Sequence, residues 1–304
     1  MAPETVPRVS VVVFVRDRDS KVFETLRSLE LQERFADIEV ILADGHPHRK
    51  LGEVARDFPW VRYLWLPGQN MPRLKGAAIE VARADIVAIL DPWDVAPPDW
   101  IGEIMAALED QGVTVVGGVV ELGGPATAAN RAAYIFEYGA FNPPQPAGPT
   151  AGEMPGNNLA LRRAALVEHC GDILESEGFN KPLCQARLRE RGATFVIRPA
   201  MRVRHLTAHR LVPFAVSRFH YARCFGATRR RLGPWSRKLL YCVFAPGVPF
   251  LLIGRHLARA RRHPSNRRLL RGSVLALLAV CAVWGTGEWI GCWLGAGRSC
   301  DKLY

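Results

Sequence analysis

Three groups of charged residues directly follow apolar segments, and residues of these types can bind a nucleotide and a metal ion. The groups are Arg16-Asp17, Asp44-Gly45 and Asp91-Pro92-Trp93-Asp94. Ligands of open α/β sheets bind where strands end, so acidic residues at neighbouring strand ends can hold a divalent cation and a ribose or base. Asp and Gly also end strands simply because they favour turns. Because three such groups are expected at one edge of the sheet, we favour a binding site over three unrelated turns.

Strand-like and helix-like segments alternate along the first two thirds of the chain. Apolar, β-branched runs predict buried strands at 9–15, 38–43, 61–66, 86–90 and 113–120. Helical spacing of apolar residues predicts helices between most of these runs. The alternation predicts an α/β fold, Rossmann-like, in which a mostly parallel sheet carries helices on both faces. The Pro-rich segment 141–156 predicts a loop beside the site.

Charge is distributed unevenly over the 304 residues. Residues 202–287 contain 17 Lys and Arg and no Asp or Glu, whereas the whole chain carries a net charge of +11. The basic residues alternate with long apolar stretches, which favours anionic membrane lipids over nucleic acid as the partner. An apolar fraction of 49% excludes a disordered chain.

The seven cysteines form no C-x-x-C pair and are odd in number. This pattern argues against a zinc site and against a disulfide framework, and it predicts buried or free thiols in a reducing compartment. The apolar run at 9–15 is too short for the core of a signal peptide, so we expect no export signal there.

The basic C-terminal third predicts membrane association. Residues 211–231 predict a basic amphipathic helix in an anionic headgroup layer, or alternatively a helix docked on the first domain. Residues 239–253 are too short to cross a bilayer and contain a Pro-Gly-Val-Pro break. We therefore expect this segment to enter and leave the membrane on the cytoplasmic side. Residues 273–296 are long enough to cross. The expected divisions are an α/β domain at 1–205, an interfacial helix region at 206–238 and hydrophobic membrane-associated helices at 239–304.

Six segments together resemble the family 2 glycosyltransferases, which have the GT-A fold. In chain order they read SVVVFVRD, LRSLELQ, EVILADGH, LKGAAIEVARADIVAILD, MPGNNLALRRAAL and RLRERGATFVIRPAMRVRH. Each motif alone is weak, but their order and spacing match the family over residues 7–205. The resemblance implies that a sugar moves from a nucleotide diphosphate sugar to an acceptor hydroxyl, with inversion at the anomeric carbon.

The resemblance also implies which residues bind the donor. Asp44 matches the aspartate that contacts the nucleotide base, and Lys75 with Arg73 would bind the diphosphate. Arg16 and Asp17 would complete the nucleotide-sugar site. Lys75 and Arg73 are otherwise ordinary surface charges at the start of a helix.

A divalent cation, Mn²⁺ or Mg²⁺, is implied by the metal motif that begins at Asp91. The family's D-x-D reads D-P-W-D here, which moves the second carboxylate, Asp94, by one residue. His205 matches a position where some GT-A enzymes add an imidazole to the metal, and it is otherwise a solvated histidine at a strand end.

The acceptor side also departs from the family pattern. Leu183 stands where the family has its acidic catalytic base, so we expect Glu177 or Glu175 to replace that base. Asn157 and Asn158 are expected acceptor-side groups, or else plain turn formers. A further departure is Gly76, where the family has asparagine after its arginine.

These patterns predict a glycosyltransferase at the cytoplasmic face of the cell membrane that acts on a lipid-linked or polysaccharide acceptor. The alternative is a catalytically silent relative that binds a nucleotide sugar or a partner and serves as a membrane scaffold. The altered metal motif and the missing base favour the silent relative, whereas Asp44, Lys75 and Asp91 favour the enzyme.

Overall fold

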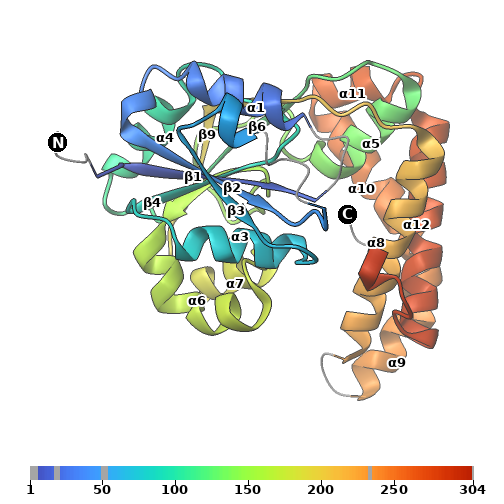
Figure 1. Ribbon diagram of the computed structural model, residues 1–304. Helices are drawn as coiled ribbons and strands as arrows, with labels where there is room; N and C mark the ends of the chain where they lie inside the picture. Colours follow the sequence, from blue (N-terminus) through green and yellow to red (C-terminus); the bar gives the residue numbers. More distant parts are fainter. Residues whose placement is uncertain (1–5, 17–20, 49–53, 232–234, 303–304) are drawn as a thin grey trace. The chain divides into compact units, whose positions relative to one another are not determined.

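The computed structural model describes residues 6–16, 21–48, 54–231 and 235–302 (Figure 1). Its contacts divide the chain into two compact units. Unit 1 comprises Met1–Glu121 and Pro143–Leu206, and unit 2 comprises Leu122–Asn142 and Thr207–Tyr304. The sequence analysis assigned residues 122–142 to the first domain, whereas in the structure they group with the C-terminal helices.

Unit 1 contains a mixed sheet with the strand order β3-β2-β1-β4-β8-β6-β9-β5, and β7 pairs with β9. The strands are β1 (Val9–Val15), β2 (Ile38–Asp44), β3 (Val61–Trp65), β4 (Ile86–Leu90), β5 (Asp94–Val95), β6 (Val115–Leu122), β7 (Gly148–Pro149), β8 (Asn158–Arg162) and β9 (Phe195–His205). Strands β3, β2, β1 and β4 are parallel to one another. Strand β8 is antiparallel to β4 and β6, and β5 and β7 are antiparallel to β9. The predicted α/β fold is confirmed, but the expected parallel order holds only for the β3-β2-β1-β4 half.

Helices cover both faces of this sheet. They are α1 (Val22–Glu30), the short α2 (Val54–Asp57), α3 (Met71–Glu80), α4 (Trp100–Glu109), α6 (Arg163–Glu177) and α7 (Lys181–Glu190), with a 3-10 turn at Phe35–Asp37. Figure 1 shows α3, α6 and α7 on one face and α1 and α4 on the other. Leu74 and Ile79 of α3 pack against Ile41 and Ile89 of the sheet. Burial of such side chains stabilises each by about 1.5–3 kcal/mol and fixes α3 against the strands.

Unit 2 is helical. Its helices are α5 (Ala128–Tyr138), α8 (Leu211–Arg231), α9 (Trp235–Phe244), α10 (Val248–Arg262), α11 (Pro264–Leu270) and α12 (Val274–Leu294), with 3-10 turns at Ala245–Gly247 and Cys300–Lys302. Helix α12 packs against α5, α8 and α10. Among the described helices, α12 alone is long and apolar enough to cross a membrane. The predicted helix at 211–231 is confirmed as α8, and it packs along α12.

Glycines allow α8 and α12 to approach closely. A Cβ added to Gly291 of α12 would lie 2.1 Å from the carbonyl oxygen of Arg223 in α8, and one added to Gly287 would lie 2.6 Å from that of Phe219. Small residues four apart are the usual means by which helix backbones come into contact in membranes. The pairing of these two helices therefore depends on the absence of side chains at these positions.

The close packing of α8 against α12 predicts that alanine substitutions at Gly291, inside this contact, and at Gly254, outside it, differ in their effect on the unfolding temperature. We expect Gly291→Ala to lower the unfolding temperature, because the new methyl group overlaps the α8 backbone. We expect Gly254→Ala, in α10, to leave it unchanged or raise it, because no atom lies within 4 Å of the added Cβ and Ala favours helix by about 1 kcal/mol. Thermal unfolding of both variants in one detergent measures this, and equal effects would contradict the packing.

One prediction about the cysteines is wrong. Cys224 of α8 and Cys300 are joined by a disulfide bond although 76 residues separate them. The parallel packing of α8 and α12 brings these positions together, which no local spacing could indicate. The other described cysteines, at residues 170, 184, 281 and 292, are buried as expected and form no disulfide within the described residues.

Candidate active site

The carboxyl ends of β2 and β4 flank that of β1, because β1 pairs with both strands. Asp44 is the last residue of β2, and Asp91 follows the last residue of β4. The two predicted site residues therefore lie at the same edge of the parallel half-sheet, where strand order changes direction around β1. Arg16 follows β1 at this edge, while Asp17 lies outside the described residues.

Lys75 and Asp91 interact electrostatically in this region. Asn70 caps α3 by accepting a hydrogen bond from the Arg73 N–H at 3.0 Å, and Lys75 lies in the second turn of that helix. Lys75 Nζ lies 4.1 Å from the centroid of the Phe14 ring in β1. Burial lowers the pKa of Lys75 to about 8, although attraction to Asp91 opposes this. Burial and the neighbouring Asp94 raise the pKa of Asp91 to about 7.

Asp94 and His205 form a buried pair. Strand β5 pairs with β9 so that Asp94 lies opposite His205, and Asp94 Oδ1 is 2.6 Å from His205 Nδ1. Asn157 Nδ2 donates to Asp94 Oδ2 at 2.8 Å. Burial raises the pKa of Asp94, and the pairing with His205 opposes the rise. Asn157 Oδ1 is buried and has no hydrogen-bond partner.

Asn158 has a different environment from its neighbour. Its Oδ1 accepts a hydrogen bond from Trp100 Nε1 at 2.9 Å. Its Nδ2 donates to the carbonyl oxygens of Val119 and Met201 at 2.8 and 2.9 Å. The side chain thus joins α4, β6 and β9 inside unit 1. Of the two predicted acceptor-side asparagines, only Asn157 contacts the buried pair of Asp94 and His205. We call these three residues the Asp94 cluster.

The Asp44 carboxylate is held by residues near the ends of β2 and β3. Its Oδ1 accepts from the His46 N–H at 2.8 Å, and its Oδ2 accepts from the Tyr63 hydroxyl. Trp65 Nε1 donates to the His46 carbonyl oxygen at 2.9 Å, and the Trp65 side chain is 41% exposed. Trp65 and Tyr63 thus join Asp44 at the edge where the nucleotide base is expected. Sequence analysis did not identify these aromatic residues as part of the site. Their position at the end of a predicted strand, where ligands bind, was the feature that could have indicated it.

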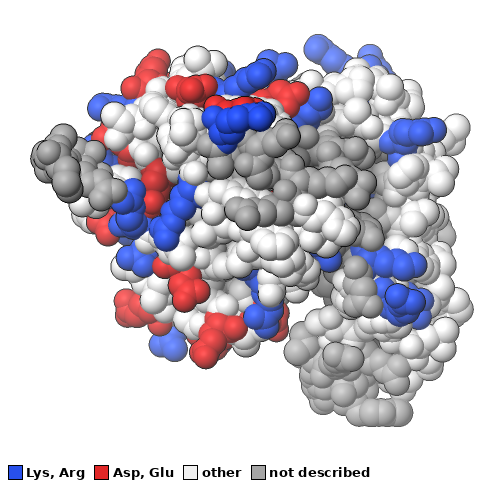
Figure 2. All heavy atoms as spheres, in the orientation of Figure 1, with Lys and Arg blue, Asp and Glu red and all other residues white. Residues whose placement is uncertain are grey.

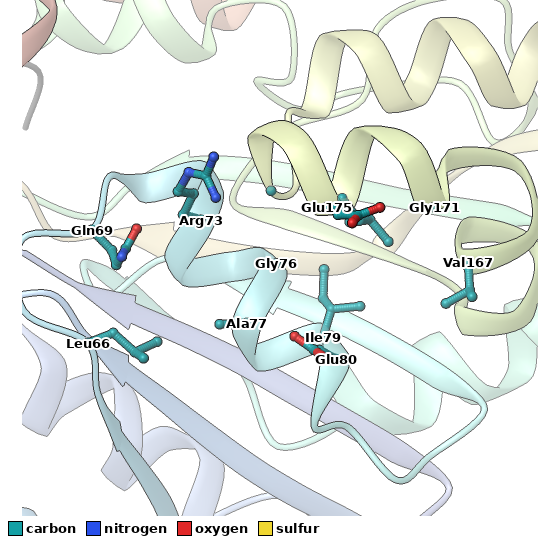
Figure 3. A pocket seen from close by; sticks show the side chains of 12 residues that line it. Leu66, Gln69, Arg73, Gly76, Ala77, Ile79, Glu80, Val167, Gly171 and Glu175 are labelled. Carbon is teal, nitrogen blue, oxygen red and sulfur yellow. The ribbon is translucent and has the colours of Figure 1, made fainter.

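Arg73 lies on a different face of α3 from Lys75. Two residues along a helix correspond to about 200° around its axis, so the two side chains point in nearly opposite directions. Arg73 Nη2 donates to the carbonyl oxygen of Ser176 at 2.5 Å. With Glu175 of α6, Arg73 lines a cavity of about 490 Å³ between the two helices (Figure 3). The structure therefore brings Arg73 together with Glu175, and not with Lys75.

The carboxylates expected to act as base lie at the end of α6. Glu177 is exposed, and its Oε2 accepts from Asn180 Nδ2 at 2.8 Å. Glu175 is exposed at the cavity just described. Leu183, the residue at the family's base position, is 40% exposed. Within the described part of the chain, neither glutamate forms a hydrogen bond or ion pair with Lys75, and the same holds for Leu183. None of the three residues is hydrogen-bonded to Asp91 or Asp94.

Lys181, at the start of α7, contacts the loop that precedes Asn157 and was missed by sequence analysis. Its Nζ donates to the Met154 carbonyl oxygen at 2.9 Å. Its aliphatic chain lies over Gly156, where a Cβ would be 3.4 Å from Lys181 Cδ. Burial lowers the pKa of Lys181, and its charge in turn lowers the pKa of Lys75. The loop at 141–156, expected to border the site, supplies these contacts.

Comparison with known proteins identifies the family. The sequence profile of Glycosyl transferase family 2 matches residues 10–169, more than half of the chain. The chain belongs to this family. No curated protein matches it in sequence. The resemblance seen in the motifs and the assignment as a glycosyltransferase are confirmed.

Solved glycosyltransferase structures share the fold of this family 2 glycosyltransferase. Mannosyltransferase PcManGT from Pyrobaculum calidifontis, in complex with GDP-Man and Mn²⁺, has a TM-score of 0.56 at 17% identity, over 99% of this chain and 88% of that one. GalNAc-T7 with UDP, GalNAc and Mn²⁺ has a TM-score of 0.51 at 13% identity, over 67% of this chain and 44% of that one. At these identities the similarity shows the fold alone, and it confirms the GT-A fold.

The residues of this site suit a divalent cation whose ligands include the phosphates of a bound nucleotide. They suit a cation held by protein side chains alone less well. In the described part of the chain, no three Asp, Glu, His or Cys side chains come together as a metal site. Asp94 is hydrogen-bonded to His205. Asp91 is therefore the carboxylate of this motif that is available to a cation. Mg²⁺ is commonly held by one or two carboxylates together with substrate phosphates. The unpartnered Asn157 Oδ1 adds a further buried oxygen to the cluster.

Proposed function

We propose that this enzyme transfers a sugar from a nucleotide diphosphate sugar to a lipid-linked or polysaccharide acceptor at the cytoplasmic face of the membrane, with inversion. The observation that carries the proposal is that Lys75 and Asp91 attract each other electrostatically at the end of β4, two strands along the same sheet edge from Asp44 at the end of β2. A cation and a carboxylate beside a base-binding aspartate match the charge distribution of a nucleotide diphosphate bound with a metal ion.

Each residue has a defined role in this proposal. Asp44 contacts the nucleotide base, and Lys75 binds the diphosphate by a charge-assisted hydrogen bond. Asp91 would hold the divalent cation, which when bound offsets the negative charge of the leaving diphosphate. PcManGT was solved with GDP-Man and Mn²⁺ and GalNAc-T7 with UDP, GalNAc and Mn²⁺, which supports a nucleotide-sugar donor and a metal for this fold.

Membrane association is supported by unit 2. Helix α12 is long and apolar enough to cross a bilayer, and it exposes Leu275, Trp289 and Trp293. Figure 2 shows blue Lys and Arg side chains among white, uncharged ones on the described surface of unit 2, at the right of the view. Apolar side chains interleaved with Arg and Lys bind anionic lipid surfaces. An enzyme anchored in this way acts on acceptors that the membrane holds.

Screening the purified full chain against nucleotide diphosphate sugars, with and without Mn²⁺, tests the proposal. The panel includes GDP-mannose and UDP-GalNAc. We expect one donor to bind in a Mn²⁺-dependent manner and to yield a glycosylated product. Binding without turnover on any acceptor would instead support the silent relative that binds a nucleotide sugar. No binding at all would contradict the proposed enzyme and leave only the silent relative that binds a partner.

A lysine variant shows whether the donor occupies the expected site. We expect Lys75→Met to weaken donor binding by about tenfold or more, because a hydrogen bond to a charged group contributes about 1.5–3 kcal/mol. Lys21→Met is the matched control, because Lys21 is an exposed lysine at the start of α1 that pairs with Glu24 of that helix. Equal donor affinity of the two variants in calorimetry would remove Lys75 from the site.

A further inference from the structure

We propose that the side-chain oxygen of Asn157 is a ligand of the divalent cation that Asp91 would hold, and that it takes the place of the second carboxylate of the metal motif. Asp94 and His205 then do not bind the cation but position the Asn157 amide. The inference rests on the proposed binding of a nucleotide diphosphate with a metal ion, and it names the protein atoms that complete that site. It replaces the acceptor-side role expected for Asn157 from the sequence.

The turn after β4 separates the second carboxylate of the motif from the first. The Asp94 N–H donates to the Asp91 carbonyl oxygen at 2.9 Å, which closes a four-residue turn with Pro92 in its second position. Asp94 then enters β5, opposite His205 of β9. Its Oδ1 lies 2.6 Å from His205 Nδ1, and its Oδ2 accepts from Asn157 Nδ2 at 2.8 Å. Both oxygens of the second carboxylate are therefore engaged by other protein groups.

The pairing of β4 with β8 brings Asn157 towards Asp91. In this antiparallel ladder Leu90, the last residue of β4, lies opposite Asn158. One residue further, the same register sets Asn157 opposite Asp91. Side chains at opposite positions share one face of a sheet, with their Cβ atoms about 4.5–5.5 Å apart. An aspartate and an asparagine at this separation can both reach one cation whose ligand oxygens lie at about 2.0–2.1 Å.

The Asn157 oxygen is a buried acceptor to which no other described residue donates. The residue is 3% exposed, and its Oδ1 has no hydrogen-bond partner among the described residues. Turning the amide over does not solve this, because Oδ1 would then face the Asp94 carboxylate, which when ionised only accepts hydrogen bonds. Buried polar atoms of native proteins nearly always have a partner. A bound cation at this position would supply the partner that the protein does not.

The two oxygens match the ligand preference of Mn²⁺ and Mg²⁺. Carboxylate and carbonyl oxygens suit these cations, whereas imidazole and thiolate suit zinc and copper. Asp91 and Asn157 supply one oxygen each, and substrate phosphates commonly supply further ligands in sites of this kind. An amide ligand is also consistent with the lack of any group of three Asp, Glu, His or Cys side chains in the described part of the chain, because asparagine is not one of these types.

Mn²⁺ binding in the presence of a nucleoside diphosphate tests the proposal without turnover. The full chain in detergent is titrated with Mn²⁺ and the nucleoside diphosphate of the donor that binds in the panel, and free Mn²⁺ is measured by electron paramagnetic resonance. We expect Asn157→Leu, which has a similar shape, to weaken Mn²⁺ binding by about tenfold or more and to leave metal-free binding of the nucleoside diphosphate unchanged. Gln111→Leu is the matched control, because Gln111 is an exposed amide in the turn after α4.

A change of metal preference distinguishes a ligand from a structural role. We expect Asn157→Cys to lose Mn²⁺-dependent affinity for the nucleoside diphosphate and to gain Cd²⁺-dependent affinity, because a thiolate is a soft ligand. We expect Gln111→Cys to show neither change. A purely structural role of Asn157 predicts a fall in Tm with no change in metal preference, and that result would overturn the proposal.

The same titrations separate this inference from the proposed function. If the wild-type chain binds the nucleoside diphosphate with Mn²⁺ and Asn157→Leu binds both as tightly, the assignment of Asn157 fails and the proposed function stands. If the wild-type chain shows no Mn²⁺-dependent binding, the proposed function fails as well. Coupling of the bound Mn²⁺ to a histidine nitrogen in the spin-echo spectrum would overturn the positioning role of His205, because it would make His205 a ligand.

Discussion

We expect Asp91→Ala to remove most of the metal-dependent part of donor binding while the protein stays folded. Asp91 follows β4 directly, and its recorded hydrogen bond is one accepted from the Trp93 N–H at 3.2 Å, so one carboxylate oxygen remains for a cation. Even groups in the outer shell of a bound metal contribute about 10–100-fold to its affinity, so we expect the loss of this carboxylate to weaken Mn²⁺-dependent binding by at least about a hundredfold.

Calorimetric titration of the nucleoside diphosphate, with and without Mn²⁺, measures this loss. Glu24→Gln is the control, because Glu24 is an exposed carboxylate that pairs with Lys21 on α1. Circular dichroism shows whether each variant is folded. Unchanged affinity in a folded Asp91→Ala protein would mean that the cation, if one binds, is held elsewhere.

Asp94→Ala has its main effect on stability. The side chains of Asp94 and His205 are 0% and 4% exposed, and removal of Asp94 takes a buried hydrogen-bond partner from both the imidazole and the Asn157 amide. Breaking a buried pair from one side costs about 3–5 kcal/mol. For a domain of about 150–250 residues, 1 kcal/mol corresponds to roughly 2–4 °C in Tm, so we expect a fall of about 10 °C.

The comparison of Asp94→Ala with Asp94→Asn separates stability from binding. Asn keeps the shape and can still hydrogen-bond His205, so we expect it to recover part of the lost Tm. We expect donor affinity to be less affected than by Asp91→Ala. A large loss of donor affinity at an unchanged Tm would show instead that Asp94 is a metal ligand.

Local patterns predicted the four strands of the parallel half of the sheet, and also β6, to within two residues. The runs at 9–15 and 86–90 coincide with β1 and β4, and the other predicted strand ends differ by at most two residues from β2, β3 and β6. A buried strand needs a continuous apolar run, and that signal lies within a few residues of sequence. The same reasoning placed Asp44 and Asp91 at strand ends. Their common edge follows from parallel order, which alternating helices impose.

Long-range pairing was beyond these patterns. Strand β8 was not predicted at all, because five residues of an antiparallel strand within the segment after the 141–156 loop give a weak signal. Asp94 and His205 lie 111 residues apart, and only the pairing of β5 with β9 brings them together. Lys181 drew no attention in the sequence, because a single lysine at a helix start is ordinary until its surroundings are known.

The sequence by itself determined the family, the α/β fold and the concentration of positive charge after residue 201, and it predicted Asp44, Lys75 and Asp91 as the donor-side residues. These features are carried by residue type, order and short-range periodicity, which survive without coordinates. The tertiary structure alone decided that Asp94 is hydrogen-bonded to His205, that Arg73 points away from Lys75, that Lys181 contacts the loop at 141–156 and that Cys224 is joined to Cys300. Each of these depends on which distant segments pack together, and packing is set by the whole chain rather than by the residues next to one another in sequence.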